Sequence, residues 1–218
     1  LKVHCKIALV RRLESRGPVI YNYLSTGNFH EDTAKVYSDL GLFTADKRLT
    51  TETTRVFAFL ETKQLPTKPF VNLAVGKFNL KQRLKDLIND EITKAKKGKE
   101  AAIILKMNSL QDEEMISLLY EAGREGVEIK LIIRGICCIV PGVPDVSDNI
   151  TGISIVDRYL EHARIFIFGA KEEAKIYLSS ADWMGRNLHH RIETMFPIYD
   201  ESIKAQILTL LDIQLHDN

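Results

Sequence analysis

Two histidines in this chain of 218 residues open an apolar run and are each followed, two positions later, by a cation. His4 precedes Lys6 in the first pair. His162 precedes Arg164 in the second, and both pairs stand at the start of an apolar run typical of a β-strand. Side chains two positions apart in a strand point to the same face. A neutral imidazole can attack phosphorus and a cation can neutralise phosphoryl oxygens, so each pair has the residue types of half a phosphoryl-transfer site.

The sequence that follows each pair also repeats. Residues 24–28 (LSTGN) follow the first pair after a second apolar run, and residues 178–182 (LSSAD) follow the second pair in the same way. The hydroxyl of Ser180 and the amide of Asn28 could donate hydrogen bonds to a bound anion. We therefore predict two related half-sites that face each other across one anionic pocket. One histidine would attack while the other donates a proton to the leaving group or stabilises it.

Apolar periodicity predicts a mixed α/β fold that holds these groups in place. Strands are expected at 3–10, 19–24, 101–107, 127–133, 153–156, 164–168, 175–178 and 192–198, and helices at 31–38, 50–62, 80–97, 112–123 and 201–215. The first two strands would form a hairpin. The strand–helix–strand order over 101–133 predicts a parallel pair with a crossover. Two prolines in 63–69 indicate a linker, and we expect domains at 1–67 and 68–218.

Composition narrows the classes of function and location. The net charge is +1, so no global basic field indicates a nucleic-acid partner. No apolar run reaches the roughly 18 residues of a membrane span. The three cysteines are odd in number and lack metal-ligand spacing, which fits a reducing compartment. We expect a cytoplasmic protein, with peripheral attachment to a membrane left open.

The paired half-sites resemble those of the phospholipase D superfamily, which forms phosphohistidine intermediates. The chain departs from that pattern, because no aspartate is evident after the first pair and the second cation is Arg164. A longer set of segments resembles the polyphosphate kinase family of the histidine-phosphoenzyme type, and these segments run in family order over nearly the whole chain. They are residues 2–6 (KVHCK), 25–29 (STGNF), 33–39 (TAKVYSD), 42–46 (LFTAD), 133–137 (IRGIC), 154–162 (SIVDRYLEH) and 178–184 (LSSADWM).

This resemblance implies a four-domain enzyme that reversibly moves the terminal phosphate of ATP onto polyphosphate through a phosphohistidine. The chain would be the end of the third domain and all of the fourth, with a phospholipase D-like mixed sheet flanked by helices. It begins with Leu1 rather than Met, so we expect a fragment that is inactive when isolated. Its partners would be ATP or ADP, polyphosphate, and the missing amino-terminal and head domains. Mg²⁺ is implied as well, with ligands upstream of Leu1, and no metal ligands are assigned within the chain.

The resemblance also implies residue roles. His4 matches the phosphorylated histidine of the family, and His162 matches its second essential histidine. Tyr37, Arg134 and His162 match positions that contact ATP. Arg134 would also end a buried strand, where ligands of α/β proteins commonly bind.

Other polar side chains remain candidates from their types and positions. Lys6 and Arg164 would clamp phosphoryl oxygens, and Arg164 could do so with two hydrogen bonds. Arg158 is a candidate phosphate ligand, with a salt bridge to a neighbouring acid as the alternative. Asn28 and Ser180 could bind phosphate, hold the histidines or simply form turns. Asp182 could orient an imidazole, but we expect it to cap a helix that begins at Trp183.

Departures from the family leave some points open. Tyr23 stands where many members have a histidine, and Cys5 stands where many have alanine. Two alternative functions remain, a phosphodiesterase of the phospholipase D kind and a polyphosphate-binding module without turnover. The leading strands of the first half would be missing, so a second copy of the chain could pair with the open edge and form a homo-oligomer.

Overall fold

The computed structural model describes residues 1–216, and its largest element is a seven-stranded mixed sheet. The sheet contains β6 (Ala74–Val75), β7 (Ala102–Met107), β8 (Glu128–Ile133), β9 (Ile150–Ile153), β11 (Arg164–Phe168), β12 (Lys175–Ser179) and β14 (Thr194–Pro197). Their spatial order is β6-β14-β12-β11-β7-β8-β9. The predicted parallel pair β7–β8 is confirmed, and β11 runs antiparallel to both of its neighbours.

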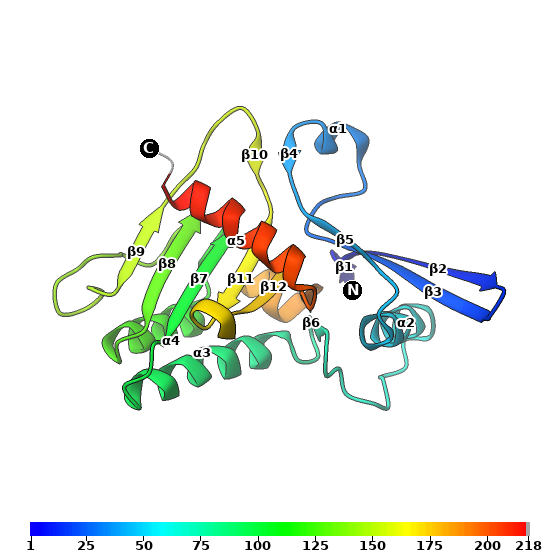
Figure 1. The fold of residues 1–218 in the computed structure, drawn as a ribbon, viewed down its shortest axis with the longest axis horizontal. Coiled ribbons are helices and arrows are strands. Elements are labelled where there is room, and N and C mark those ends of the chain that lie inside the picture. The colour runs from blue at the N-terminus through cyan, green and yellow to red at the C-terminus, as the bar shows by residue number, and fades with distance from the viewer. Residues whose placement is uncertain (217–218) are drawn as a thin grey trace.

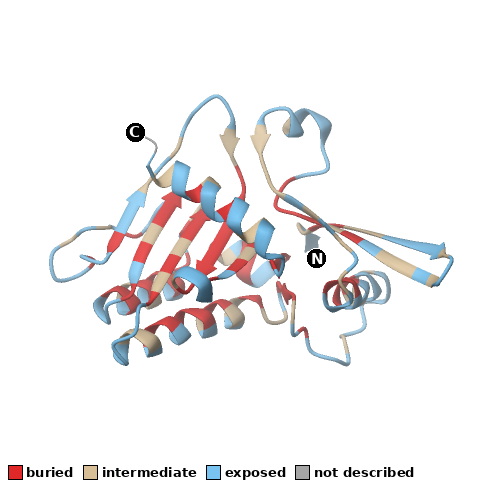
Figure 2. Ribbon diagram, in the orientation of Figure 1, coloured by how far each residue is buried: buried red, intermediate tan, exposed pale blue. Residues whose placement is uncertain are grey.

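Helices cover both faces of this sheet. Figure 1 shows α3 (Leu80–Lys96) and α4 (Glu113–Arg124) together on one side, with α5 (Glu201–Leu215) crossing the other. Central β11 is buried along its whole length (Figure 2). Its side chains alternate between the two cores, because Phe166 and Phe168 join the core under α3 and α4 while Ile165 and Ile167 join the core under α5. The predicted mixed α/β class is therefore confirmed.

The first part of the chain forms a smaller three-stranded sheet. The predicted hairpin is confirmed as β2 (Lys6–Glu14) and β3 (Gly17–Ser25), and β5 (Gly41–Thr44) pairs with β3 on its other side. Helix α2 (Lys47–Thr62) packs on this sheet and is capped at its start by Asp46, whose side chain accepts from the backbone N–H of Arg48. The distal half of the hairpin extends away from the rest of the molecule (Figure 1).

Two short parallel strand pairs join the two parts of the chain. One pair is β1 (Lys2–Val3) with β13 (Arg191–Ile192), and the other is β4 (Tyr37–Ser38) with β10 (Leu160–Glu161). Each pair therefore brings a strand that leads into a histidine beside a strand from the opposite part. The buried carboxylate of Glu52 on α2 adds a further tie, because it accepts hydrogen bonds from the backbone N–H groups of residues 71–73.

Four predicted elements are wrong in extent. The strand expected at 3–10 is interrupted at residues 4 and 5 into β1 and β2, and β2 continues to Glu14. The helix expected at 31–38 is only α1 (Glu31–Ala34), because the chain then turns to pair as β4 with β10. The strand expected at 153–156 is β9, three residues earlier, since Ile150 is buried beside Ile129 whereas Val156 is 83% exposed. The strand expected at 192–198 is interrupted at Glu193 into β13 and β14, and a π-helix, η2 (Arg186–His190), precedes it.

Candidate active site

The imidazole of His4 lies against a carboxylate from the far end of the chain. Its Nδ1 is 2.9 Å from an oxygen of Glu193. An ionised carboxylate only accepts hydrogen bonds, so Nδ1 carries the ring proton and Nε2 keeps its lone pair. The backbone supports this arrangement, because the N–H groups of His4 and Cys5 both donate to the carbonyl of Ile192, 2.9 Å away.

Glu193 is fully buried and receives three hydrogen bonds. Besides the Nδ1–H of His4, the Ser180 hydroxyl donates to Oε2 and the Asn187 amide donates to Oε1 at 2.7 Å. The Ser180 oxygen also accepts from the backbone N–H of Thr194 at 3.1 Å. These donors satisfy both oxygens of the buried carboxylate.

The second histidine has the same arrangement, supplied from the first part of the chain. His162 Nδ1 lies 2.8 and 2.9 Å from the two oxygens of Asp39. The Thr26 hydroxyl donates to Asp39 at 2.7 Å and accepts from the backbone N–H of Leu40 at 3.0 Å. The backbone N–H of His162 donates to the carbonyl of Ser38 at 3.1 Å. The two half-sites thus correspond residue by residue. The carboxylate that holds each histidine comes from the other half of the chain.

Sequence reasoning missed both carboxylates, although the repeat contains a signal for them. Asp39 comes 11 residues after Asn28, and Glu193 comes 11 residues after Asp182. The repeat therefore extends past its Ser-rich turn to an acid. Matching the two copies beyond that turn would have paired these residues. It would not have shown that each acid serves the histidine of the other copy.

Each predicted cation lies over its histidine ring. Lys6 Nζ is 3.1 and 3.3 Å from the two ring nitrogens of His4, and Arg164 Nη1 is 3.0 and 3.2 Å from those of His162. A group equally near both nitrogens must lie above the ring plane, because Cε1 separates the nitrogens in that plane. Both cations are buried and occupy equivalent positions, paired with Ser25 and Ser179 in their ladders.

Asp182 does not cap a helix, and that prediction is wrong. Its carboxylate receives hydrogen bonds from Arg164, at 3.1 and 3.2 Å, and from the backbone N–H of Asn108 at 2.9 Å. Trp183 begins no helix but lies in an isolated β-bridge with Leu110. Burial opposes ionisation of Asp182, but the charge and hydrogen bonds of Arg164 outweigh it, so the pKa of Asp182 is lowered.

Tyr37, Arg134 and Asn28 lie in three different environments. The Tyr37 ring lies beside His162, with ring centroids 4.9 Å apart. Arg134 follows β8 and donates to the side-chain oxygen of Asn108 at 2.8 Å. The backbone N–H of Asn108 in turn donates to Asp182. Asn28 is exposed at its turn.

Arg158 and Ser180 lie differently from what we expected of phosphate ligands. Arg158 is exposed, with its guanidinium 5.5 Å from the Tyr159 ring centroid. Within residues 1–216 no hydrogen bond or ion pair joins Arg158 to either histidine. Ser180 is fully buried, and its hydroxyl is engaged by Glu193 and Thr194. Its place indicates that it positions Glu193.

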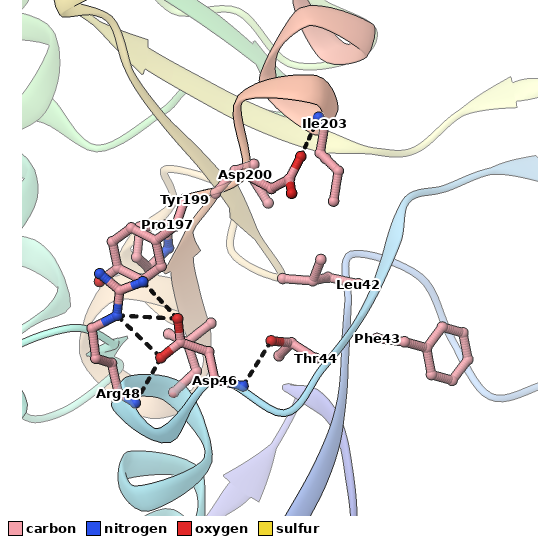
Figure 3. Close-up of a pocket in the computed structure, with 11 residues that line it drawn as sticks. Leu42, Phe43, Thr44, Asp46, Arg48, Pro197, Tyr199, Asp200 and Ile203 are labelled. Carbon is pink, nitrogen blue, oxygen red and sulfur yellow. Dashed lines mark hydrogen bonds and ion pairs between the residues drawn. The ribbon is translucent and has the colours of Figure 1, made fainter.

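A cavity of about 370 Å³ lies away from the histidines, between β5 and the starts of α2 and α5 (Figure 3). Arg48 lies 3.5 Å over the Tyr199 ring and forms an ion pair with Asp46 at 2.6 Å. None of the predicted site residues lines this cavity.

Burial changes the proton affinity of two site groups. Burial lowers the pKa of Lys6 from its ordinary value to about 8, although the charges of Glu193 and Asp39 oppose this effect. Burial also lowers the pKa of His162, with its hydrogen bond to Asp39 opposing this effect and the charge of Arg164 adding to it. His162 is therefore neutral at pH 7 and can accept a proton.

The lowered pKa of Lys6 predicts a pH-dependent anion affinity. Below about pH 8 the ammonium is charged in the free protein, and above it a proton must be taken up when a phosphate binds. The affinity for tripolyphosphate should therefore fall by up to about tenfold per pH unit above pH 8. Calorimetry across this range measures the slope. Lys6→Arg should abolish it, because a guanidinium stays charged. An unchanged slope in this variant would show that another group titrates.

The described residues do not by themselves fit a Mg²⁺ site. Within residues 1–216 no group of three or more His, Cys, Asp or Glu side chains is arranged to hold a metal ion. The site carboxylates Asp39, Glu193 and Asp182 are each already bonded to a histidine or an arginine. No step below is routed through a metal. Within the same range, no helix is long and apolar enough to cross a membrane.

The chain thus contains two related half-sites, each with a histidine, a buried cation and a carboxylate supplied by the other half. The family profile of polyphosphate kinase C-terminal domain 1 matches residues 1–66, and that of polyphosphate kinase C-terminal domain 2 matches residues 73–218. The chain belongs to the polyphosphate kinase family.

Relatives and a solved structure agree with this membership. The chain is 46% identical to polyphosphate kinase of Vibrio cholerae and 43% identical to that of Escherichia coli K12, over 100% of its own length. It spans only 31% of each of these relatives. The crystal structure of polyphosphate kinase from Porphyromonas gingivalis superimposes with a TM-score of 0.93 at 44% identity, covering 100% of this chain and 34% of that one.

Proposed function

We propose that this chain carries the histidine site of an ATP:polyphosphate phosphotransferase, with His4 as the nucleophile. The observation that carries the proposal is the pair of imidazoles whose Nδ1 atoms are held by Glu193 and Asp39. This arrangement keeps both Nε2 atoms away from the carboxylates, so their in-plane lone pairs can react, while Lys6 and Arg164 lie over the rings. The names of the relatives support ATP and polyphosphate as the substrates.

In the first step, Nε2 of His4 attacks the terminal phosphorus of ATP in line. The bond from that phosphorus to the bridging oxygen breaks, and ADP leaves with the electron pair. The imidazole becomes positively charged, and Glu193 stabilises it through Nδ1–H. Lys6, Arg164 and Arg134 stabilise charge on the equatorial oxygens. Tyr37 lies beside His162, where it would contact the nucleotide.

In the second step, a terminal oxygen of polyphosphate attacks the phosphohistidine. The phosphorus–nitrogen bond breaks, the chain grows by one phosphate, and His4 is again neutral. His162 is neutral at pH 7 because burial lowers its pKa, so it can take the proton of a protonated chain end. Asn28, at the exposed turn, would donate to the incoming chain.

Several parts of this function require residues outside the chain. Mg²⁺, the amino-terminal and head domains, and any homo-oligomer belong to the proposal for the longer protein. We keep the division at 1–67 and 68–218 as the proposed domain boundary, and a cytoplasmic location as the proposed compartment. Arg158, on an exposed segment, has no step assigned to it.

The test is to incubate the longest natural polypeptide that contains these residues with ATP and short polyphosphate. We expect ADP and longer polyphosphate to form in equal amounts, and the reverse reaction to occur with excess ADP. Hydrolysis of a phosphodiester with no chain growth would favour the phospholipase D-like alternative. Polyphosphate binding without consumption of ATP would leave only a binding module.

A further inference from the structure

Glu193 and Asp39, the carboxylates that hold the two histidines, differ in one respect that the sequence repeat does not predict. Glu193 is 0% exposed and both of its oxygens are bonded, Oε2 by Ser180 and Oε1 by Asn187. Asp39 is 17% exposed at its side chain. Within residues 1–216 it receives side-chain hydrogen bonds from His162 and Thr26 but from no amide side chain. The amide donor is therefore specific to the half-site that contains His4.

An unusual backbone conformation places Asn187 beside Glu193. Asn187 lies in the π-helix η2, which runs from Arg186 to His190 directly before β13. Single-turn π-helices are rare and are often found at functional sites. The N–H of Asn187 donates to the carbonyl of Met184 at 2.9 Å, and Leu188 anchors the turn in the core with 3% exposure. The first copy has α1 in the corresponding stretch, with no buried residues and no such amide.

The orientation of the Asn187 amide is fixed by its partner. Its side chain is buried, with 1% exposure of the residue, and its Oδ1 has no hydrogen-bond partner among residues 1–216. A flipped amide would set Oδ1 against a carboxylate oxygen, and two acceptors repel each other. The arrangement leaves one buried atom unpaired, and in return an N–H is directed at Oε1 of Glu193.

We propose that Asn187 is a positioning residue for His4, which acts by holding the Glu193 carboxylate in one rotamer. This inference rests on the proposed function. With Oε1 held by Asn187 and Oε2 held by Ser180, the carboxylate stays in the rotamer that places both of its oxygens 2.9 Å from Nδ1 of His4. The ring proton then stays on Nδ1, and the nucleophilic lone pair stays on Nε2. Asp39 receives no such amide hydrogen bond within residues 1–216. The structure therefore assigns the more tightly held carboxylate to the half-site that contains His4.

Two variants at Asn187 should give different pH profiles for phosphorylation of His4. Asn187→Ala removes a donor to the ionised carboxylate, so the rate should fall about tenfold to a hundredfold. Its pH profile should also differ from that of the wild type, because the carboxylate loses one of its hydrogen-bond donors. Asn187→Asp places two carboxyl groups together, which must share a proton to coexist. Its rate should therefore fall as the pH rises, opposite in sign to the wild type.

The measurement is rapid-quench labelling of the full polypeptide with ATP labelled at the terminal phosphate, over about pH 4 to 8. Asn22→Ala is a matched control. Asn22 is 2% exposed, makes one side-chain hydrogen bond, to Thr53 at 2.8 Å, and also has an unpartnered Oδ1. It should lose stability in thermal unfolding without a change in the pH profile.

The outcomes separate this inference from the function on which it rests. If the wild type labels His4 and both Asn187 variants keep its pH profile, the positioning role is wrong. The same holds if Asn187→Ala only lowers the melting temperature, as Asn22→Ala should. If the wild type acquires no label at His4, the proposed function fails first.

Discussion

Replacing His4 by asparagine is expected to abolish phosphoryl transfer, with a loss of about 10⁶-fold, the scale seen when a covalent nucleophile is removed. An asparagine amide nitrogen can take the place of Nδ1 and keep the hydrogen bond to Glu193, which is 2.9 Å in the wild type. It has no counterpart of Nε2. The variant thus removes the attacking atom while leaving the buried carboxylate with its three donors.

Turnover of ATP, label incorporation and thermal unfolding should be measured on the same sample. We expect a melting temperature close to that of the wild type, because no buried charge is left unpaired. His162→Asn is the reciprocal variant and should still acquire label at His4, at a reduced rate. Label incorporation that survives in His4→Asn but is lost in His162→Asn would reverse the two roles.

Replacing Glu193 by glutamine is expected to lower the rate of His4 phosphorylation by about 10⁴-fold, as when the orienting carboxylate of a catalytic triad becomes an amide. Glu193 accepts from His4, Ser180 and Asn187. Glutamine offers one acceptor oxygen and one amide group in place of two acceptor oxygens. Where its amide N–H₂ faces His4, Nδ1 must give up its proton to accept from it. The proton then moves to Nε2 and blocks the lone pair.

Glu91→Gln serves as the matched control. Glu91 is 1% exposed on α3 and accepts from Lys94 at 2.8 Å and from the backbone of Ala102 at 3.3 Å. It contacts neither histidine. Both variants lose a buried charge, so both should unfold at lower temperature, but only Glu193→Gln should lose phosphorylation. Equal rates in the two variants would mean that Glu193 is structural rather than orienting.

The parts of the fold that sequence predicted well are those with strong local periodicity. The extents of β11 and α5 match the predicted ranges at both ends, 164–168 and 201–215. The hairpin and the parallel pair β7–β8 were also predicted. In each case apolar spacing alone distinguishes the strand from the helix.

The elements that were missed depend on partners far away in the sequence. The two residues of β4 are held by β10, more than 120 positions along the chain, and β1 is held by β13 in the same way. Two-residue strands have no periodicity to recognise. The π-helix η2 is likewise set by the burial of Leu188 and by the bond from Asn187 to Glu193.

The candidate site shows the same division. The histidine–cation pairs follow from an i, i+2 spacing, so their common face is visible in the sequence. The exchange of Asp39 and Glu193 between the halves depends on how the halves dock, and no local pattern contains that information. The roles of Asn28, Arg158 and the domain boundary remain predictions.

The most direct test of a phosphohistidine at His4 is to find the phosphate itself. The full polypeptide would be mixed with ATP labelled at its terminal phosphate, quenched in alkali, digested and analysed by peptide mass spectrometry. We expect acid-labile, alkali-stable label on the peptide that contains His4, and its disappearance when polyphosphate is added. Label on the peptide of His162 would contradict the assignment of the nucleophile, and ATP consumption with no label on either peptide would contradict covalent transfer.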